Sequence, residues 1–120
     1  MNLTYLASPY SVGNADAAKR EQRFRHSCQA AARLMQTGEN IFCPIAHSHP
    51  IEVHGMNGAI EGHDFWLKQD FAVLKHCSKM IVVMMEGWMA STGIKREMDV
   101  AKHIGIPIEY IDPSDLGIVE

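Results

Sequence analysis

Ser91, Gly93 and Glu97 are the residues whose types and spacing most directly suggest chemistry. Ser91 and Gly93 stand where a predicted helix begins, and a helix N-terminus presents free backbone N–H groups and the positive end of the helix dipole. These features favour the binding of an anion. Glu97 follows about one and a half turns later and borders the core face, so we expect its carboxylate to point toward the end of the sheet. The simpler alternative is a surface glutamate paired with Lys95 or Arg96.

Asp70 is a second carboxylate that could do chemistry. It shares a predicted helix face with Trp66 and Val73, so it is half-buried if Trp66 packs inward. A buried acid needs a partner or serves a function, because burial disfavours its charged form. The alternative is an exposed residue that pairs with Lys68 or Lys75, although neither lies at the helical spacing of three or four.

The segment 45–62 is the longest stretch without a regular pattern, and we interpret it as a functional or mobile loop. It contains His47 and His49, whose spacing to His54, and to His63 and Asp64 beyond the segment, matches no standard zinc pattern. Histidine also occurs in loops that bind phosphate or stack on bases. A metal site, a ligand contact and an ordinary loop therefore all stay open.

Tyr5 and Ser8 lie at the end of the first predicted strand. A strand tyrosine is more often a core residue than a catalytic one. The loop that follows is neither a GxGxxG turn nor a P-loop, so it gives no support for binding a dinucleotide or ATP by those devices. Trp66 and Trp88 could form an aromatic wall for a planar base, but ordinary packing explains each of them equally well.

Short apolar runs alternate with helical periodicity along the whole chain. The pattern predicts strands over 3–7, 40–43, 79–85 and 106–111, and helices over 15–37, 64–76 and from Ser91 to Gly105, with a weakly structured tail over 112–120. Strands that alternate with helices indicate a parallel sheet. We therefore predict a single α/β domain over residues 1–120, a three-layer Rossmann- or flavodoxin-like fold with four to five parallel strands. Its ligand pocket is expected beyond the carboxyl ends of the strands.

The bulk properties narrow the function. The chain has 120 residues and a net charge of −3. It therefore lacks the excess of positive charge that is typical of proteins that bind nucleic acid or an anionic membrane. Its three cysteines form no zinc pattern and suggest no disulfide framework, which fits a reducing cytoplasm. No signal peptide and no apolar run of about 18 residues are visible. We therefore expect a cytoplasmic protein that binds a small molecule.

Four segments together resemble the nucleoside 2-deoxyribosyltransferase-like superfamily, which includes the deoxynucleoside monophosphate N-glycosidases. The chain is most similar to a small branch described as a domain of unknown function, the 1937-type domain. The segments are Tyr5-Leu6-Ala7-Ser8-Pro9, then Asp70 with Leu74 and Cys77-Ser78, the apolar run before residue 86, and Ser91-x-Gly93-x-x-x-Glu97 with Ala101 and Gly105-Ile106-Pro107. Ser78 replaces the aspartate usual in the family, and the histidine-containing loop departs from its common form.

The resemblance implies a role for each matching residue. Glu97 would be the nucleophile that attacks the anomeric carbon of a ribosyl or deoxyribosyl group, which suits an oxocarbenium-like transition state. Asp70 would protonate or orient the departing base, which requires a raised pKa. Tyr5 would hold Glu97 by a hydrogen bond. Ser91 and Gly93 would bind a 5′-phosphate or 5′-hydroxyl.

Further residues are our own additions to this site, because no family motif covers them. His47, His49, Trp66 and Trp88 are expected to shape the base or phosphate pocket, and Ser8 to contact the substrate. We expect no cofactor and no metal, and the resemblance implies a homo-oligomer, either a dimer or a tetramer.

The leading hypothesis is an enzyme that hydrolyses or transfers the N-glycosidic bond of a nucleoside or nucleotide. One alternative is a nucleotide-binding or sensing module without turnover, in which the histidine-containing loop has remodelled the pocket. The other is a metal-dependent hydrolase that uses the loop histidines.

Overall fold

The structure, a computed structural model, describes residues 2–56 and 62–120. Strands and helices alternate along the chain, as the sequence predicts. The elements are the strands Thr4–Ala7 (β1), Ile41–Phe42 (β2), Lys79–Val83 (β3) and Ile108–Ile111 (β4), the α-helices Ala17–Gln36 (α1), Pro44–Gly55 (α2), His63–Leu74 (α3) and Thr92–Ile104 (α4), and the 3₁₀-helices Trp88–Ala90 (η1) and Pro113–Leu116 (η2). Helix α1 begins at Ala17 rather than at residue 15, because Asp16 is its N-cap and accepts a hydrogen bond from the Lys19 backbone N–H.

The four strands form one parallel sheet in the order β2-β1-β3-β4. The chain therefore leaves β1 for β2 on one side, while β3 pairs with the other side of β1. Ligands of open parallel sheets bind beyond the carboxyl ends of the strands, at such a change of direction. The predicted α/β class and parallel sheet are confirmed, and the sheet has four strands in the described part of the chain.

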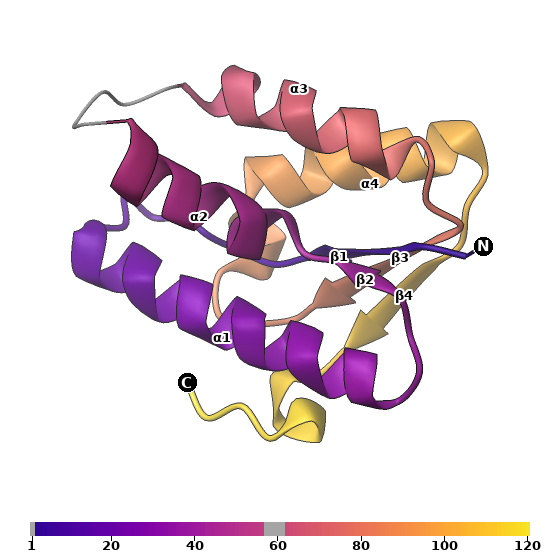
Figure 1. Cartoon of the computed structure of the whole chain (residues 1–120), viewed down its shortest axis with the longest axis horizontal. Coiled ribbons are helices and arrows are strands. Elements are labelled where there is room, and N and C mark those ends of the chain that lie inside the picture. The colour runs from indigo at the N-terminus through magenta and orange to yellow at the C-terminus, as the bar shows by residue number, and fades with distance from the viewer. Residues whose placement is uncertain (1, 57–61) are drawn as a thin grey trace.

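The sheet is the middle of three layers, as Figure 1 shows, with α1 on one face and α3 and α4 on the other. Alternate residues of each strand supply the two cores, because successive strand side chains point to opposite faces. Leu6, Ile81 and Val83 pack with α1, whereas Tyr5 and Val82 pack with α3 and α4. No helix within the described residues is both long enough and apolar enough to cross a membrane.

Helix α2 corrects the prediction of a loop over 45–62. The segment 44–55 is helical and packs against α1 and β1. Pro44 occupies the first helical position, where its fixed φ is favourable, but Pro50 lies inside the helix and cannot donate to the carbonyl of Ala46. These prolines and the low amphipathicity of the segment concealed the helix. Residues 57–61 of the predicted loop lie outside the described residues.

The tail is also more ordered than predicted. Asp112 accepts hydrogen bonds from the backbone and side chain of Ser114 and starts η2. Leu116 and Ile118 are buried in the core on the α1 side of the sheet. These two buried residues of a nine-residue tail give little periodic signal, but they are enough to hold it against the core.

Candidate active site

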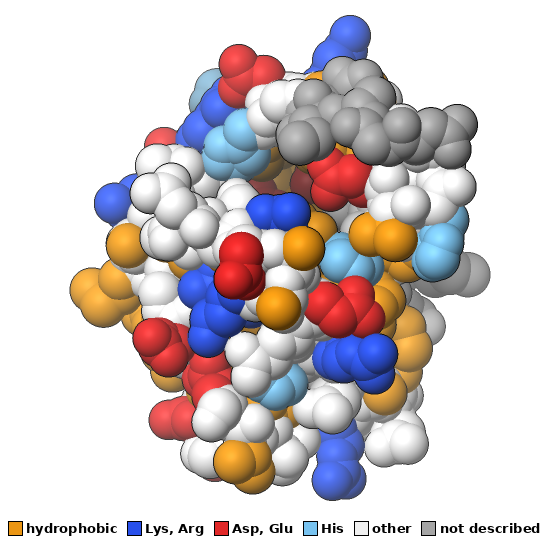
Figure 2. Space-filling view, turned by 90° about the vertical axis from the view of Figure 1, so that its left-hand side faces the viewer, with side chains coloured by type: hydrophobic (Ala, Val, Ile, Leu, Met, Phe, Trp, Pro, Cys, Tyr) orange, Lys and Arg blue, Asp and Glu red, His pale blue; other side chains and the backbone are white. Residues whose placement is uncertain are grey.

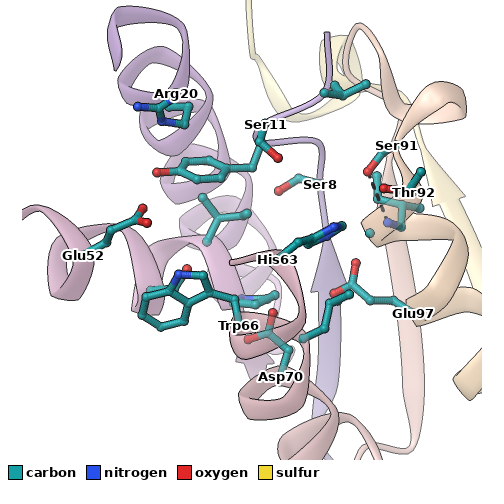
Figure 3. Close-up of a pocket in the computed structure, with 18 of the residues that line it drawn as sticks. Ser8, Ser11, Arg20, Glu52, His63, Trp66, Asp70, Ser91, Thr92 and Glu97 are labelled. Atoms are coloured by element: carbon teal, nitrogen blue, oxygen red, sulfur yellow. Dashed lines mark hydrogen bonds between the residues drawn. The ribbon is translucent and has the colours of Figure 1, made fainter. Parts of the chain in front are cut away.

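A cavity of about 690 Å³ opens at the carboxyl ends of the strands. Its walls come from the loop after β1, the start of α1, the helices α2 and α3, and the turn that leads into α4 (Figure 3). Figure 2 looks onto this end of the molecule and shows acidic, basic and histidine side chains mixed on it, without a field of one sign. The prediction of a pocket at this edge of the sheet is confirmed.

Glu97 is the most enclosed charged group of this cavity. It lies on the buried face of α4 with Ile94 and Ala101, at spacings of three and four, and only 6% of it is exposed. Its carboxylate accepts a hydrogen bond from the hydroxyl of Tyr5, which is fully buried in β1. The alternative of a surface glutamate is therefore wrong, and Arg96 pairs instead with Asp64.

Asp70 approaches the same place from α3. It lines the cavity together with Leu67, Trp66 and His63, which lie three, four and seven residues before it on one helix face. The Asp70 side chain is half-buried, and Figure 3 shows it pointing into the cavity below Glu97. The structure thus brings the two predicted carboxylates together.

Burial dominates the electrostatics of these groups. Burial raises the pKa of Glu97 to about 8, the Tyr5 hydrogen bond opposes that rise, and the neighbouring Asp70 adds to it. Burial also raises the pKa of Asp70 to about 7. Desolvation and the nearby Glu97 carboxylate raise the pKa of Tyr5 well above its ordinary value, so Tyr5 remains a donor. Interacting acids titrate as a pair, so near neutral pH the two carboxyl groups can share a proton.

The N-terminus of α4 forms another part of the wall. Ser91 is the N-cap, and its side chain accepts a hydrogen bond of 3.2 Å from the Ile94 backbone N–H. Gly93 allows a close approach, because a Cβ atom there would lie 2.9 Å from Nε2 of His63. Figure 3 shows His63 reaching across the cavity toward this helix end.

The loop after β1 is held in place by α1. The Ser8 and Ser27 hydroxyls form a hydrogen bond of 2.7 Å, and both serines are buried. One guanidinium nitrogen of Arg23 donates to the backbone carbonyls of Tyr10 and Val12, each at 2.8 Å. The part of the cavity wall that contains Ser8 and Tyr10 is therefore fixed by hydrogen bonds to α1.

The chain is similar to known proteins in sequence and in fold. Residues 2–112 match a family model whose description is "Domain of unknown function (DUF1937)". The chain belongs to this family. A solved structure of a 2-deoxyribosyltransferase from the psychrotolerant bacterium Bacillus psychrosaccharolyticus has a similar fold, with a TM-score of 0.64 and 22% identity over 92% of this chain and 72% of that one. No curated protein gave a match.

The DUF1937 chain does not place every predicted site residue in the cavity. Ser8, Trp66, Ser91 and Gly93 line it with the two carboxylates. His47 is exposed and packs against Phe42, and Trp88 packs against Tyr110 on β4. Neither residue lines the cavity.

His49 also lies behind the wall, and the structure gives it a different environment from the one predicted. It is 6% exposed and bonded to Glu21 and Tyr10. The histidines of 45–62, which are His47, His49 and His54, do not form a metal-binding cluster. Among residues 2–56 and 62–120, no three His, Cys, Asp or Glu side chains form a group that could hold a metal ion.

The sequence interpretation missed several polar residues of the cavity. None of Tyr10, Arg20, Ser48, Glu52 and His63 was expected to bind the substrate, and His63 was considered only as a possible metal ligand. Ser48 and Glu52 share a face of α2, so the missed helix concealed them. His63 extends the Trp66–Asp70 face by one turn and could have been found from that spacing.

Proposed function

We propose that this protein cleaves the N-glycosidic bond of a nucleoside or nucleotide, with Glu97 as the nucleophile. The observation that carries the proposal is the buried Glu97 carboxylate, bonded to Tyr5 and facing a large cavity beside Asp70. A 2-deoxyribosyltransferase of similar fold adds support at the level of architecture.

The first step forms one bond and breaks another. A Glu97 oxygen bonds to the anomeric carbon, the bond from that carbon to the base nitrogen breaks, and the base leaves with the electron pair. A carboxylate suits this step because positive charge develops on the sugar in the transition state. The covalent glycosyl-enzyme divides a difficult displacement into two easier ones.

Asp70 supplies the proton that the departing base needs. Burial raises its pKa to about 7, so a large fraction of Asp70 is protonated near neutral pH. The Tyr5 hydroxyl donates to Glu97 and so favours its charged form. The pKa of Glu97, about 8, lies above that of Asp70, about 7, so the ligand-free pair holds its proton mainly on Glu97. The reactive state has the proton on Asp70 and the charge on Glu97, and the positive charge that develops on the sugar stabilises this arrangement.

The second step releases the sugar. Water or a second base attacks the anomeric carbon, the bond to Glu97 breaks, and Asp70 accepts the proton of the attacking group. Attack by water gives hydrolysis, and attack by a base gives transfer. The 5′ end of the sugar then lies toward Ser91 and Gly93, where the α4 N-terminus favours a hydroxyl or phosphate oxygen.

The direct test is chromatography of the free base released from a panel of nucleosides and nucleoside 5′-monophosphates. Glu97→Gln should lower the rate by about a thousandfold or more, since it removes the nucleophile. Asp99→Asn is the matched control, because Asp99 is exposed on the same helix, and it should keep the wild-type rate.

A second base added to the reaction distinguishes transfer from hydrolysis by the appearance of a new nucleoside. Equal base release by the wild-type and Glu97→Gln proteins would exclude Glu97 as the nucleophile. Nucleotide binding without any base release over long incubation would instead identify a sensing module.

A further inference from the structure

A chain of hydrogen bonds leads from the surface to the cavity through His49. Nε2 of His49 lies 2.7 Å from a carboxylate oxygen of Glu21, and Nδ1 lies 2.6 Å from the hydroxyl oxygen of Tyr10. The His49 ring stacks on Phe24 with centroids 4.3 Å apart. Glu21 is 43% exposed, His49 is buried and Tyr10 lines the cavity. Three segments, α1, α2 and the loop after β1, therefore meet at one imidazole.

The partners of a neutral His49 ring determine the direction of the Tyr10 hydroxyl. A carboxylate only accepts hydrogen bonds, so the Nε2 atom that contacts Glu21 carries a proton. In the neutral ring, Nδ1 is then an acceptor, and the Tyr10 hydroxyl donates its hydrogen to it. The Tyr10 oxygen is then left with acceptor capacity at the cavity wall, where Arg20 also lies.

Glu52 places a second acceptor at the same end of the cavity. It projects from α2 and lines the cavity with Tyr10. Burial and, next, the nearby Glu52 carboxylate raise the pKa of Tyr10 to about 12, while the nearby Arg20 guanidinium opposes that rise, so the three side chains lie close together. Figure 3 shows Glu52 and Trp66 on the side of the cavity opposite Ser91 and Thr92.

The proposed function orients a substrate between these two sides. With the anomeric carbon at Glu97 and the 5′ end near Ser91, the base extends toward Trp66 and Glu52. Trp66 offers a flat face for stacking. The hydrogen-bonding groups on the edge of the base then meet Tyr10 and Glu52.

Resting on that function, we propose that Tyr10 and Glu52 bind an exocyclic amino group, and that the substrates carry an amino-bearing base. One –NH₂ group has two N–H donors, which satisfy both acceptors. A base with an oxo group at that position would set an acceptor against these two acceptors and would lack the two N–H donors that an amino group gives them, which is costly in an enclosed site. His49 and Glu21 are positioning residues that keep the Tyr10 oxygen an acceptor.

Arg20 completes this end of the cavity. It lines the same wall, and one of its guanidinium nitrogens donates to the Ala15 carbonyl at 2.5 Å. The other donors of the guanidinium suit a ring nitrogen or carbonyl next to the amino group. Together the three residues match an edge on which an amino group adjoins an acceptor.

Calorimetric titration of the Glu97→Gln protein tests the proposal without turnover. The probes are two pairs of nucleotides, dCMP with dUMP and dAMP with dIMP. In each pair the first base carries an amino group where the second carries an oxo group. The amino member of at least one pair should bind about tenfold more tightly or better, because a missing donor leaves buried acceptors unpaired. Equal binding within both pairs overturns this inference and leaves the proposed function standing. Absence of binding by all four overturns both.

Variants in the same Glu97→Gln background separate positioning from general stability. Tyr10→Phe and Glu52→Gln should each lower the amino-to-oxo affinity ratio several-fold. His49→Phe keeps a ring against Phe24 but frees the Tyr10 hydroxyl to donate, so the ratio should fall as well. A purely structural role for His49 would lower both affinities and leave their ratio unchanged, and that result would overturn the positioning role.

Arg25→Gln is the matched control. Arg25 is the other partner of Glu21, at 3.2 Å, and its side chain is 71% exposed. This variant should keep the wild-type ratio.

Nitrogen-15 NMR of the ligand-free protein gives an independent readout. The His49 ring should carry its proton on Nε2, and the Nδ1 resonance should shift in Tyr10→Phe. A proton on Nδ1 of the neutral ring would contradict the assignment.

Discussion

Tyr5 in β1 and Glu97 in α4 are joined by a hydrogen bond between two buried side chains that lie 92 residues apart in the chain. Tyr5 stands in the middle of the sheet, paired in register with both Phe42 and Met80. The position of the Glu97 carboxylate is therefore tied to a buried strand that is paired on both sides. Placement of this kind favours catalysis, because the reactive group needs no reorganisation when the substrate arrives.

Tyr5→Phe should slow base release and shift its pH dependence. A hydrogen bond to a charged group contributes about 1.5 to 3 kcal/mol, so we expect a loss of about 10- to 100-fold near neutral pH. The bond favours ionised Glu97. Its loss raises the pKa of Glu97 further and moves the acidic limb of the rate profile to higher pH. Tyr110→Phe, at a half-exposed tyrosine of β4, is the control. An unshifted acidic limb in Tyr5→Phe would show that the bond does not set the charge of Glu97.

Glu97→Gln should stabilise the protein at alkaline pH. Burial raises the pKa of Glu97 from 4.5 to about 8, so the folded chain holds this proton more tightly than the unfolded chain. Wild-type stability should therefore fall as the pH rises from about 4.5 to about 8. Glutamine has no charge to bury and still accepts from Tyr5, so the variant should gain on the order of 2 kcal/mol at pH 8.5 and little at pH 4.

Urea unfolding at several pH values measures this difference. Asp99→Asn changes the same charge on the exposed side of α4 and should run parallel to the wild type. A constant difference between Glu97→Gln and wild type across this pH range would contradict the burial of a charged Glu97.

Gly93→Ala should act on the cavity through His63. The new Cβ would lie 2.9 Å from Nε2 of His63, so the imidazole must swing away, which is easy for the end of a side chain. Stability should change by less than about 1 kcal/mol, whereas nucleotide affinity should fall several-fold. The double variant with His63→Ala relieves the clash. Non-additive effects on affinity are expected, and additive effects would contradict direct contact.

Much of the site was predictable because its signals are local. Short apolar runs that alternate with helices predict the parallel sheet. The sheet in turn predicts the edge at which a pocket forms. Glu97 borders the core face of a clearly amphipathic helix, so its direction followed from its spacing to Met98 and Ala101. The same reasoning put Trp66 and Asp70 on one helix face but left open whether that face is buried.

The rest could not be predicted, because it depends on contacts between distant segments. The helical turn around Pro50 is retained by packing against α1, and nothing local favours it. His49 carried an obvious chemical signal but acts through Tyr10, whose neighbours come from α1 and α2. Glu52 was concealed by the missed helix. Local pattern thus left an ordinary alternative open for each carboxylate and the family resemblance singled both out, while the end of the cavity opposite them required the tertiary structure.

The two tryptophans provide a final test of where the ligand binds. Trp66 lines the cavity, whereas Trp88 packs against Tyr110 outside it. A base stacked on an indole changes its fluorescence, so Trp88→Phe, which keeps Trp66, should respond to added dCMP. Trp66→Phe, which keeps Trp88, should show little change and bind more weakly, since base–aromatic stacking contributes about 1 to 3 kcal/mol. A strong response from Trp88 alone would move the binding site away from the cavity between Asp70 and Glu52.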